Sequence, residues 1–317
     1  MMMTKNRKIV FVSLALTLAV LAVSAFAFWD EIGSAYRSLT KQPDKHGVYR
    51  VDDYYMEYAG AYSEKSAAGF VKKLNSIKST YLTADNRTFY AIVPDKAYYA
   101  QDAGYPVFDY ASMQSAVRAG LTEFTEIDLF PVLSLTDYYK TDIHWRQDKL
   151  APTVMALGDT MGFAVDAQAF TAQTQEGFVG SYAKSITGKA PPDTLVYLTS
   201  PVTDAANVEN YQYPDFHAVY DTARLASKLP YDVFLSGASP VITIENPLAT
   251  SEQSLIIFRD SFASSLAPLL LPAYKSITLI DLRYMATPLL RDFVAFDKQD
   301  VLFLYSVPVV NSSAMLR

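Results

Sequence analysis

The chain of 317 residues contains no cysteine. This absence excludes disulfide bridges, a cysteine nucleophile and any zinc site built from thiolates. Histidine is scarce, with three residues, and tryptophan has only two. Basic residues are outnumbered, with 27 Lys and Arg against 33 Asp and Glu, and the net charge is −6. Because a nucleic-acid surface needs clustered Lys and Arg, this class of partner is not expected.

Hydrophobic residues, in contrast, make up half of the chain. That content is enough for a sizeable core in one large domain or two small ones. Tyrosine is abundant, with 23 residues. Exposed tyrosine suits the binding of sugar rings, but cores and sheets use tyrosine as well, so composition leaves both interpretations open.

The N-terminus carries a basic flank followed by an uncharged apolar run, Ile9 to Trp29. A run of about 20 apolar residues can span a bilayer as a helix. We therefore expect residues 1–29 to form a signal anchor or transmembrane helix. The basic flank would stay in the cytoplasm, and the rest of the chain would lie on the extracellular side. Ala25-Phe26-Ala27 also offers a small-x-small cleavage site, so a cleaved signal peptide and a secreted product are the alternative.

The remainder of the chain reads as a linker over residues 30–50 and one domain over residues 51–317, with an irregular insertion over about 165–250. Predicted strands lie at 88–93, within 121–129, and at 195–198, 241–244, 254–258, 277–281 and 301–305. Predicted helices lie at 63–82, 111–119, 147–161, 263–274 and 288–296. The strand–helix–strand–helix–strand order of the last third predicts a parallel sheet covered on both faces.

Ser261 follows the predicted strand 254–258 and begins the next helix. This position places its hydroxyl at the sheet edge, near backbone N–H groups that stabilise a developing anion. A serine hydroxyl is a poor nucleophile unless a base, usually a histidine held by a carboxylate, takes its proton. A serine at a helix start is also a common N-cap, and the position alone does not separate the two roles.

The segment YYKTDIHW, residues 138–145, could supply both partners. His144 stands two residues after Asp142, and in an extended segment this spacing puts both side chains on one side. Histidine is the side chain that serves as a base near neutral pH. The pair could instead bond to each other in a structural loop. Trp145 reads as a packing residue that fixes this loop.

A metal site starting at the same pair is the other alternative, but only His46 and His217 remain to complete it. Neither lies near the pair in the sequence, and by elimination both read as non-catalytic. We therefore predict no metal and no cofactor.

Two segments together resemble the DHHW protein family, whose name spells Asp-His-His-Trp. YYKTDIHW resembles its signature, and Asp260-Ser261-Phe262 followed by SITLIDLRY, residues 276–284, resembles its second conserved block. The family is similar to the SGNH-like O-acetyltransferases of alginate and related bacterial exopolysaccharides. In those proteins an Asp-x-His motif precedes the serine, whereas the usual SGNH hydrolases have the serine first. The resemblance implies an α/β, SGNH-hydrolase-like three-layer sandwich with a permuted order of motifs.

The resemblance also implies a function and a set of roles. The protein would be an exported serine O-acyltransferase acting on a cell-envelope or exopolysaccharide glycan. Ser261 would be the nucleophile, His144 the base and Asp142 the residue that orients it. Asn311 would stabilise the oxyanion together with the Ser261 N–H, with Tyr305 or Ser306 as alternatives. A multi-pass membrane acyltransferase would be the partner that donates the acyl group.

Three positions depart from the family pattern: Ile143 replaces the first His of the name, Arg259 replaces the Gly common before Asp-Ser, and no Gly follows Asp281. Two other functions stay open. One is an acetyl esterase of the same fold, in which water accepts the acyl group. The other is a non-catalytic glycan-binding or assembly protein with a vestigial triad.

Overall fold

The structure is a computed structural model that describes residues 28–29 and 31–317. The apolar run predicted to be an anchor lies outside these residues, apart from its last two positions. Within the described part of the chain, no helix combines the length and apolarity needed to cross a membrane.

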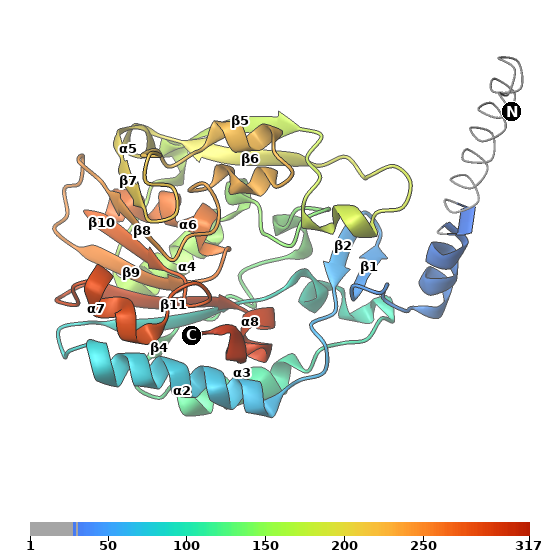
Figure 1. Ribbon diagram of the computed structural model, residues 1–317, viewed down its shortest axis with the longest axis horizontal. Helices are drawn as coiled ribbons and strands as arrows, with labels where there is room; N and C mark the ends of the chain where they lie inside the picture. The colour runs from blue at the N-terminus through green and yellow to red at the C-terminus, as the bar shows by residue number, and fades with distance from the viewer. Residues whose placement is uncertain (1–27, 30) are drawn as a thin grey trace, which may run out of the picture.

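The centre of the fold is a seven-stranded sheet in the order β4-β3-β11-β9-β10-β8-β7 (Figure 1). Its strands are β3 (Thr88–Val93), β4 (Thr125–Glu126), β7 (Asn207–Asn210), β8 (Val241–Glu245), β9 (Ser254–Arg259), β10 (Ser276–Ile280) and β11 (Asp300–Ser306). The five strands from β4 to β10 pair in parallel. β8 is antiparallel to both of its neighbours. The sheet is therefore mixed, with its predicted parallel part at the centre.

Helices cover both faces of this sheet. They are α2 (Glu64–Tyr81), α3 (Tyr110–Gly120), α4 (Ala151–Met161), α5 (Pro201–Ala205), α6 (Ala263–Leu270), α7 (Leu290–Phe293) and α8 (Val307–Asn311). Alternate residues of a strand point to opposite faces. Accordingly, Ile256 of β9 packs in the same cluster as Phe70 of α2. Its neighbour Ile257 packs in the other cluster, with Leu266 of α6.

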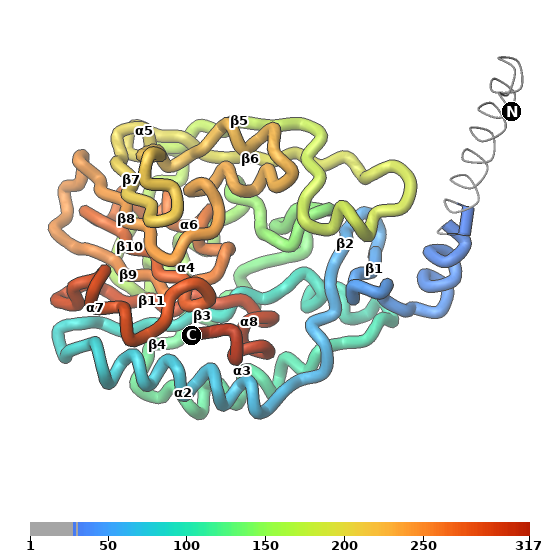
Figure 2. The backbone as a smooth tube through the Cα atoms, in the orientation of Figure 1, coloured from blue at the N-terminus to red at the C-terminus, as the bar shows by residue number. Residues whose placement is uncertain are grey.

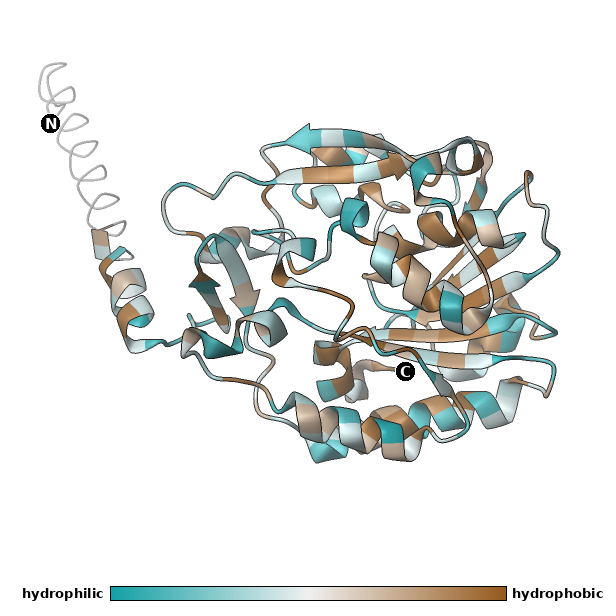
Figure 3. Cartoon of the chain, turned by 180° about the vertical axis from the view of Figure 1, so that it is seen from behind, coloured by the Kyte–Doolittle hydropathy of each residue, from teal (hydrophilic) through white to brown (hydrophobic). Residues whose placement is uncertain are grey.

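The hydropathy of the elements follows this arrangement. In Figure 3 the strands of the sheet are largely apolar, whereas α2 alternates between polar and apolar residues along its length. The buried residues of α2 recur at the helical spacing Phe70, Leu74 and Ile77, and Ser63 caps its first turn by accepting a hydrogen bond from Ser66 N. The prediction of a helix at residues 63–82 is confirmed.

Two segments are more regular than predicted. Within the stretch expected to be a linker, residues 31–40 are helical. The strand β1 (Val48–Val51) follows and pairs with β2 (Tyr54–Glu57). Within the segment expected to be an irregular insertion, β7 and β8 extend the central sheet, because the edge of β10 is open to pairing with the apolar residues of β8. The same segment forms the hairpin of β5 (Thr171–Glu176) and β6 (Thr194–Thr199).

The two ends of the domain lie side by side. Figure 2 shows the C-terminal segment around α8 next to α2, which comes from the first third of the domain. The Ser313 hydroxyl donates to the Ser66 carbonyl of α2 at 2.7 Å. The last residues of the chain thus complete one face of the sheet.

Candidate active site

Ser261 lies in the turn between β9 and α6. β9 is hydrogen-bonded on both sides, to β11 and to β10, so its carboxyl end is held near the middle of the sheet. The turn is fixed by the buried Asp260 carboxylate, which accepts from Phe262 N at 3.1 Å and from Ser306 N at 2.8 Å. The carboxyl ends of parallel strands are where α/β proteins place their ligand sites, and Ser261 lies at such an end.

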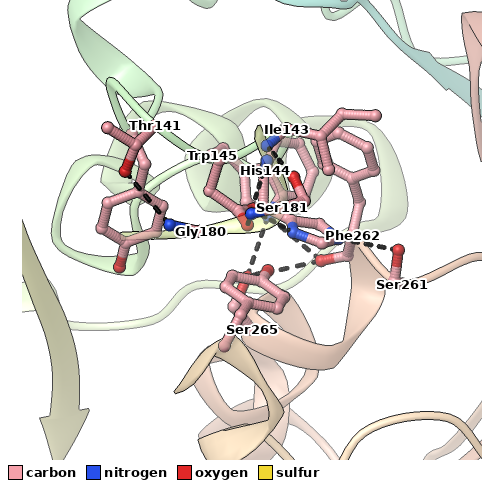
Figure 4. Close-up of polar contacts among 12 residues, drawn as sticks. Thr141, Ile143, His144, Trp145, Gly180, Ser181, Ser261, Phe262 and Ser265 are labelled. Atoms are coloured by element: carbon pink, nitrogen blue, oxygen red, sulfur yellow. Dashed lines mark hydrogen bonds and ion pairs between the residues drawn. The ribbon is translucent and has the colours of Figure 1, made fainter. Parts of the chain in front are cut away.

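The segment of residues 138–145 forms a closed loop that is tied to the start of α6. Tyr138 and Trp145 pair as an antiparallel bridge at its base. Trp145 is fully buried, and its Nε1–H donates to the carbonyl of Phe262 at 3.0 Å and to Ser265 Oγ at 2.9 Å (Figure 4). These bonds hold the loop against the residue that follows Ser261.

Asp142, His144 and Ser261 are connected by hydrogen bonds in series. His144 Nε2 lies 2.7 Å from Ser261 Oγ (Figure 4). His144 Nδ1 lies 2.5 Å from Asp142 Oδ1. The carboxylate also accepts from its own loop, through His144 N at 2.9 Å, and from Ser181 N at 2.7 Å. Distances in this range allow proton transfer between a nucleophile and its base.

The environment of Asp142 keeps its carboxylate ionised. Burial by itself raises the pKa of this group, but the charge and the hydrogen bond of His144 and two backbone N–H groups outweigh that effect. The net result lowers the pKa of Asp142 to about 2. An ionised Asp142 fixes the tautomer in which Nδ1 carries the hydrogen and Nε2 accepts from Ser261.

Two residues that sequence reasoning missed shape this arrangement. The Tyr231 ring stacks on the His144 ring, with centroids 3.8 Å apart and planes 4° apart, and its hydroxyl donates to Ser265 Oγ. Gly180 packs against Asp142 so closely that a Cβ there would lie 2.2 Å from the Asp142 Cβ. Both residues come from the segment expected to be irregular, where no periodic pattern marks them.

The three side chains border a cavity of about 190 Å³. Arg259, Ser264 and Arg283 line it as well. Leu229 and Tyr284, which are half exposed, stand among its lining residues. The Ser261 hydroxyl therefore meets a small space that suits a short acyl group.

Asn311 is not part of this arrangement, contrary to the prediction. Its Oδ1 accepts from Ser63 N at 2.8 Å, and its Nδ2 donates to the carbonyls of Ala59 and Ala61 at 3.0 Å each. The amide is thus occupied by the chain leading into α2, and Asn311 does not line the cavity. The end of β11 reaches the turn of residues 260–262 through the backbone of Ser306 instead.

The other two histidines also lie outside the site. The Nδ1 of His217 is within 3.1 Å of the Val208 carbonyl, and His46 N donates to Asp44. In the described part of the chain, no group of His, Asp and Glu residues has the arrangement needed to hold a metal ion.

The fold and this geometry together define an α/β protein with a serine, a histidine and an aspartate arranged as serine-dependent acyl transfer requires. The family model described as DHHW protein matches residues 134–280, a range that contains the loop of residues 138–145 and the turn with Ser261. The predicted resemblance to the DHHW family is confirmed.

Several solved structures share the fold. A DHHW family protein from Eubacterium siraeum is 20% identical, with a TM-score of 0.69 over 86% of this chain and 94% of that chain. Bacillus cereus PatB1 with a sulfonyl adduct is 18% identical, with a TM-score of 0.67 over 83% and 95% of the two chains. The O-acetyltransferase domain of Pseudomonas putida AlgJ is 12% identical, with a TM-score of 0.50 over 84% and 92%. No match was found among curated proteins.

Proposed function

We propose that this protein is an exported serine O-acyltransferase that moves acetyl groups onto a cell-envelope or exopolysaccharide glycan. The observation that carries the proposal is the unbroken hydrogen-bond series from Ser261 through His144 to Asp142 at the cavity. The shared fold of the AlgJ O-acetyltransferase domain supports it. So does the sulfonyl adduct of PatB1, because sulfonyl groups attach to activated nucleophiles.

In the first half of the reaction, Ser261 Oγ attacks the carbonyl carbon of the acyl donor and its proton passes to His144 Nε2. The electron pair of the C=O bond moves to oxygen and forms a tetrahedral oxyanion. When this intermediate collapses, the donor oxygen leaves and takes the proton from His144. The acyl group remains on Ser261 as an ester, and Asp142 stabilises the imidazolium between the two steps.

In the second half, a sugar hydroxyl attacks the acyl carbon and gives its proton to His144. A second tetrahedral intermediate collapses, and Ser261 leaves with the proton. The product is an O-acylated sugar. If water takes the place of the sugar, the same steps describe an acetyl esterase, so the two functions differ only in the acceptor.

The proposal extends to the architecture and the location of the protein. The fold would be an SGNH-like three-layer sandwich with a permuted order of motifs, since the loop with Asp142 and His144 precedes Ser261 and all three meet at the carboxyl end of β9. Residues 1–29 would anchor it as a single-pass membrane protein with the domain outside the cell. A multi-pass membrane acyltransferase would supply the acyl groups.

A serine-reactive fluorophosphonate separates the enzyme from a non-catalytic glycan-binding protein. We expect the wild-type protein to be labelled at Ser261, as located by peptide mass spectrometry, and to hydrolyse 4-nitrophenyl acetate. Ser261→Ala should lose the label and at least about 10³-fold of the hydrolysis rate while its thermal unfolding is unchanged. A wild-type protein that takes no label and hydrolyses no ester would contradict the proposal and favour the binding protein.

Transfer is then distinguished from hydrolysis by adding oligosaccharide acceptors to the same assay. A transferase should release 4-nitrophenol faster with an acceptor present, and the acceptor should gain the mass of an acetyl group. An esterase should show neither effect.

A further inference from the structure

The turn of residues 260–262 offers one clear donor for an oxyanion. This donor is the Ser261 N–H, which makes no hydrogen bond within the described part of the chain. Oxyanion holes use at least two donors, and each is worth a large factor in rate. Since the Asn311 amide is occupied next to α2, the second donor has to come from another group that lines the cavity.

Arg259 is an unusual member of that lining. It is the last residue of β9, and its side chain is 1% exposed. Its Nη1–H donates to Ser264 Oγ at 2.9 Å, whereas Nε and Nη2 have no partner among the described residues. Burying N–H groups of a cation without acceptors is costly, so a buried arginine of this kind needs a reason to be kept.

Nearby carboxylates balance the charge of Arg259 without bonding to it. The pKa of Arg259 is lowered by burial, and the charge of Asp281 opposes that change. Asp281 itself is engaged by Arg283, through bonds of 2.9 Å and 2.6 Å to its two oxygens. The only side chain to which Arg259 donates, within the described residues, is therefore Ser264.

Ser264 lies one helical turn after Ser261, and its N–H donates to the Ser261 carbonyl at 3.1 Å. This bond closes the turn that leads into α6, and both side chains line the same cavity. Ser264 is 97% buried. Its hydroxyl oxygen accepts a hydrogen bond from Arg259, and its hydroxyl hydrogen has no acceptor among the described residues. A hydroxyl that accepts from a cation is polarised and becomes a stronger donor.

We propose that the Ser264 hydroxyl, held by Arg259, is the second donor of the oxyanion hole. This inference rests on the proposed function. As Ser261 Oγ bonds to the carbonyl carbon and its proton moves to His144, the carbonyl oxygen gains the C=O electron pair. That oxygen accepts from the Ser261 N–H and from the Ser264 O–H. Ser264 is thus a catalytic residue, and Arg259 is a positioning residue that acts through it.

The test compares steady-state hydrolysis of 4-nitrophenyl acetate by the full-length wild-type protein and by variants. Ser264→Ala should lower kcat by about 10²–10³-fold and change KM by less than about 3-fold, because the lost bond forms only in the transition state. Ser264→Thr, which keeps a hydroxyl, should recover most of the rate. Ser264→Cys keeps the volume but has only a weak S–H donor, so it should be slow as well.

Arg259→Met separates positioning from packing. Replacing a buried cation by an apolar side chain of similar size should leave the thermal midpoint unchanged or raised. A positioning role nevertheless predicts a fall in kcat on the order of 10-fold, because the hydroxyl loses its alignment. In the double variant with Ser264→Ala, the loss should be no larger than for Ser264→Ala alone, since the two residues act through one bond.

Ser313→Ala is the matched control, because it removes a buried hydroxyl that donates to the Ser66 carbonyl of α2 and does not line the cavity. It should lower stability without changing kcat. If Ser264→Ala and Ser264→Cys both hydrolyse the ester within about 3-fold of the wild-type rate, Ser264 is not an oxyanion donor. Because the wild-type protein would still be labelled at Ser261, that result would leave the proposed function standing. If the wild-type protein were not labelled, both the proposed function and the oxyanion role of Ser264 would be contradicted.

Discussion

At the scale of single residues, Gly180 packs against Asp142 too closely to leave room for a side chain. A Cβ at this position would lie 2.2 Å from the Cβ of Asp142 and 2.3 Å from its Oδ2. Either the loop with Asp142 or the segment of Gly180 would have to move, and either movement shifts His144. We expect Gly180→Ala to lower the hydrolysis rate strongly and to destabilise the protein by about 1–3 kcal/mol. Ester hydrolysis and thermal unfolding measure the two effects.

Gly177→Ala is the control for this substitution. Gly177 has a positive φ of 73° but open space around its Cβ position. Alanine there should cost stability through backbone strain alone and leave the rate unchanged. A Gly180→Ala variant that behaved like Gly177→Ala would mean that the Asp142 loop adapts without harm to His144.

Asp142 links the site to the acid stability of the protein. Its pKa is about 2 in the folded state against 3.8 as its ordinary value. A depressed folded pKa contributes stability above pH 3.8, and the contribution is lost as the pH falls through about 2. The shift corresponds to about 2 kcal/mol. Urea unfolding between pH 5 and pH 2 should therefore show a steeper loss of stability for the wild-type protein than for Asp142→Asn. Equal slopes would show that Asp142 is not the group responsible.

At the scale of elements, Asn311 belongs to the contact between α8 and α2. Its side chain makes three hydrogen bonds to the backbone before α2. We expect Asn311→Ala to lower the free energy of unfolding by about 1–3 kcal/mol, because these partners lose their bonds. The value of kcat should not change. A large fall in kcat with unchanged stability would instead restore Asn311 as an oxyanion donor.

The central strands could be predicted from the sequence because they are buried on both faces. β3, β9 and β11 are continuous apolar runs, and their predicted and observed bounds agree to within one residue. β7 was missed and β8 was not assigned to the sheet, because edge pairing depends on which strand presents a free edge. That information is not local. Of the strand predicted within residues 121–129, only the two residues of β4 pair with the sheet.

In the site, too, residues within sequence motifs could be predicted, whereas residues that matter through contacts in the folded chain could not. Motif positions identified Asp142, His144 and Ser261, and the structure brings the three together. Tyr231 and Gly180 act through direct contact with this group, and neither contact has a sequence pattern. For Asn311, the resemblance implied a role in the site near the end of β11, and the structure places its side chain elsewhere. Its amide bonds to the Ser63 N–H and to the carbonyls of Ala59 and Ala61. Only the folded chain shows that these backbone groups lie next to Asn311.

At the scale of the whole molecule, the sheet brings together the two parts of the chain that would carry the proposed reaction. His144 and Ser261 are 117 positions apart and meet because the loop after β4 crosses to the end of β9. The bonds of Trp145 to Phe262 and Ser265 fix that crossing. Local unfolding of either part would therefore separate His144 from Ser261, so on heating the activity should be lost at or below the temperature of global unfolding.

The location of the molecule gives the last prediction. The full chain, expressed in a bacterium, should remain in the membrane fraction with its domain accessible to added protease from outside the cell. The apolar run of residues 9–29 is long enough to stay in the bilayer after export. Leu16→Arg combined with Leu18→Arg should weaken insertion, since each arginine at the centre of a span costs about 2.5–3.5 kcal/mol. Leu18→Ile is the matched control and should behave like the wild-type chain.

The intact mass of the exported protein separates an anchor from a cleaved signal. An anchored protein retains residues 9–29, whereas cleavage after Ala27 would leave a product that begins at Phe28 and appears in the medium. A protease-resistant domain in intact cells would contradict export itself. It would then also remove the glycan of the cell envelope as an acceptor, because that glycan and the Ser261 site would lie on different sides of the membrane.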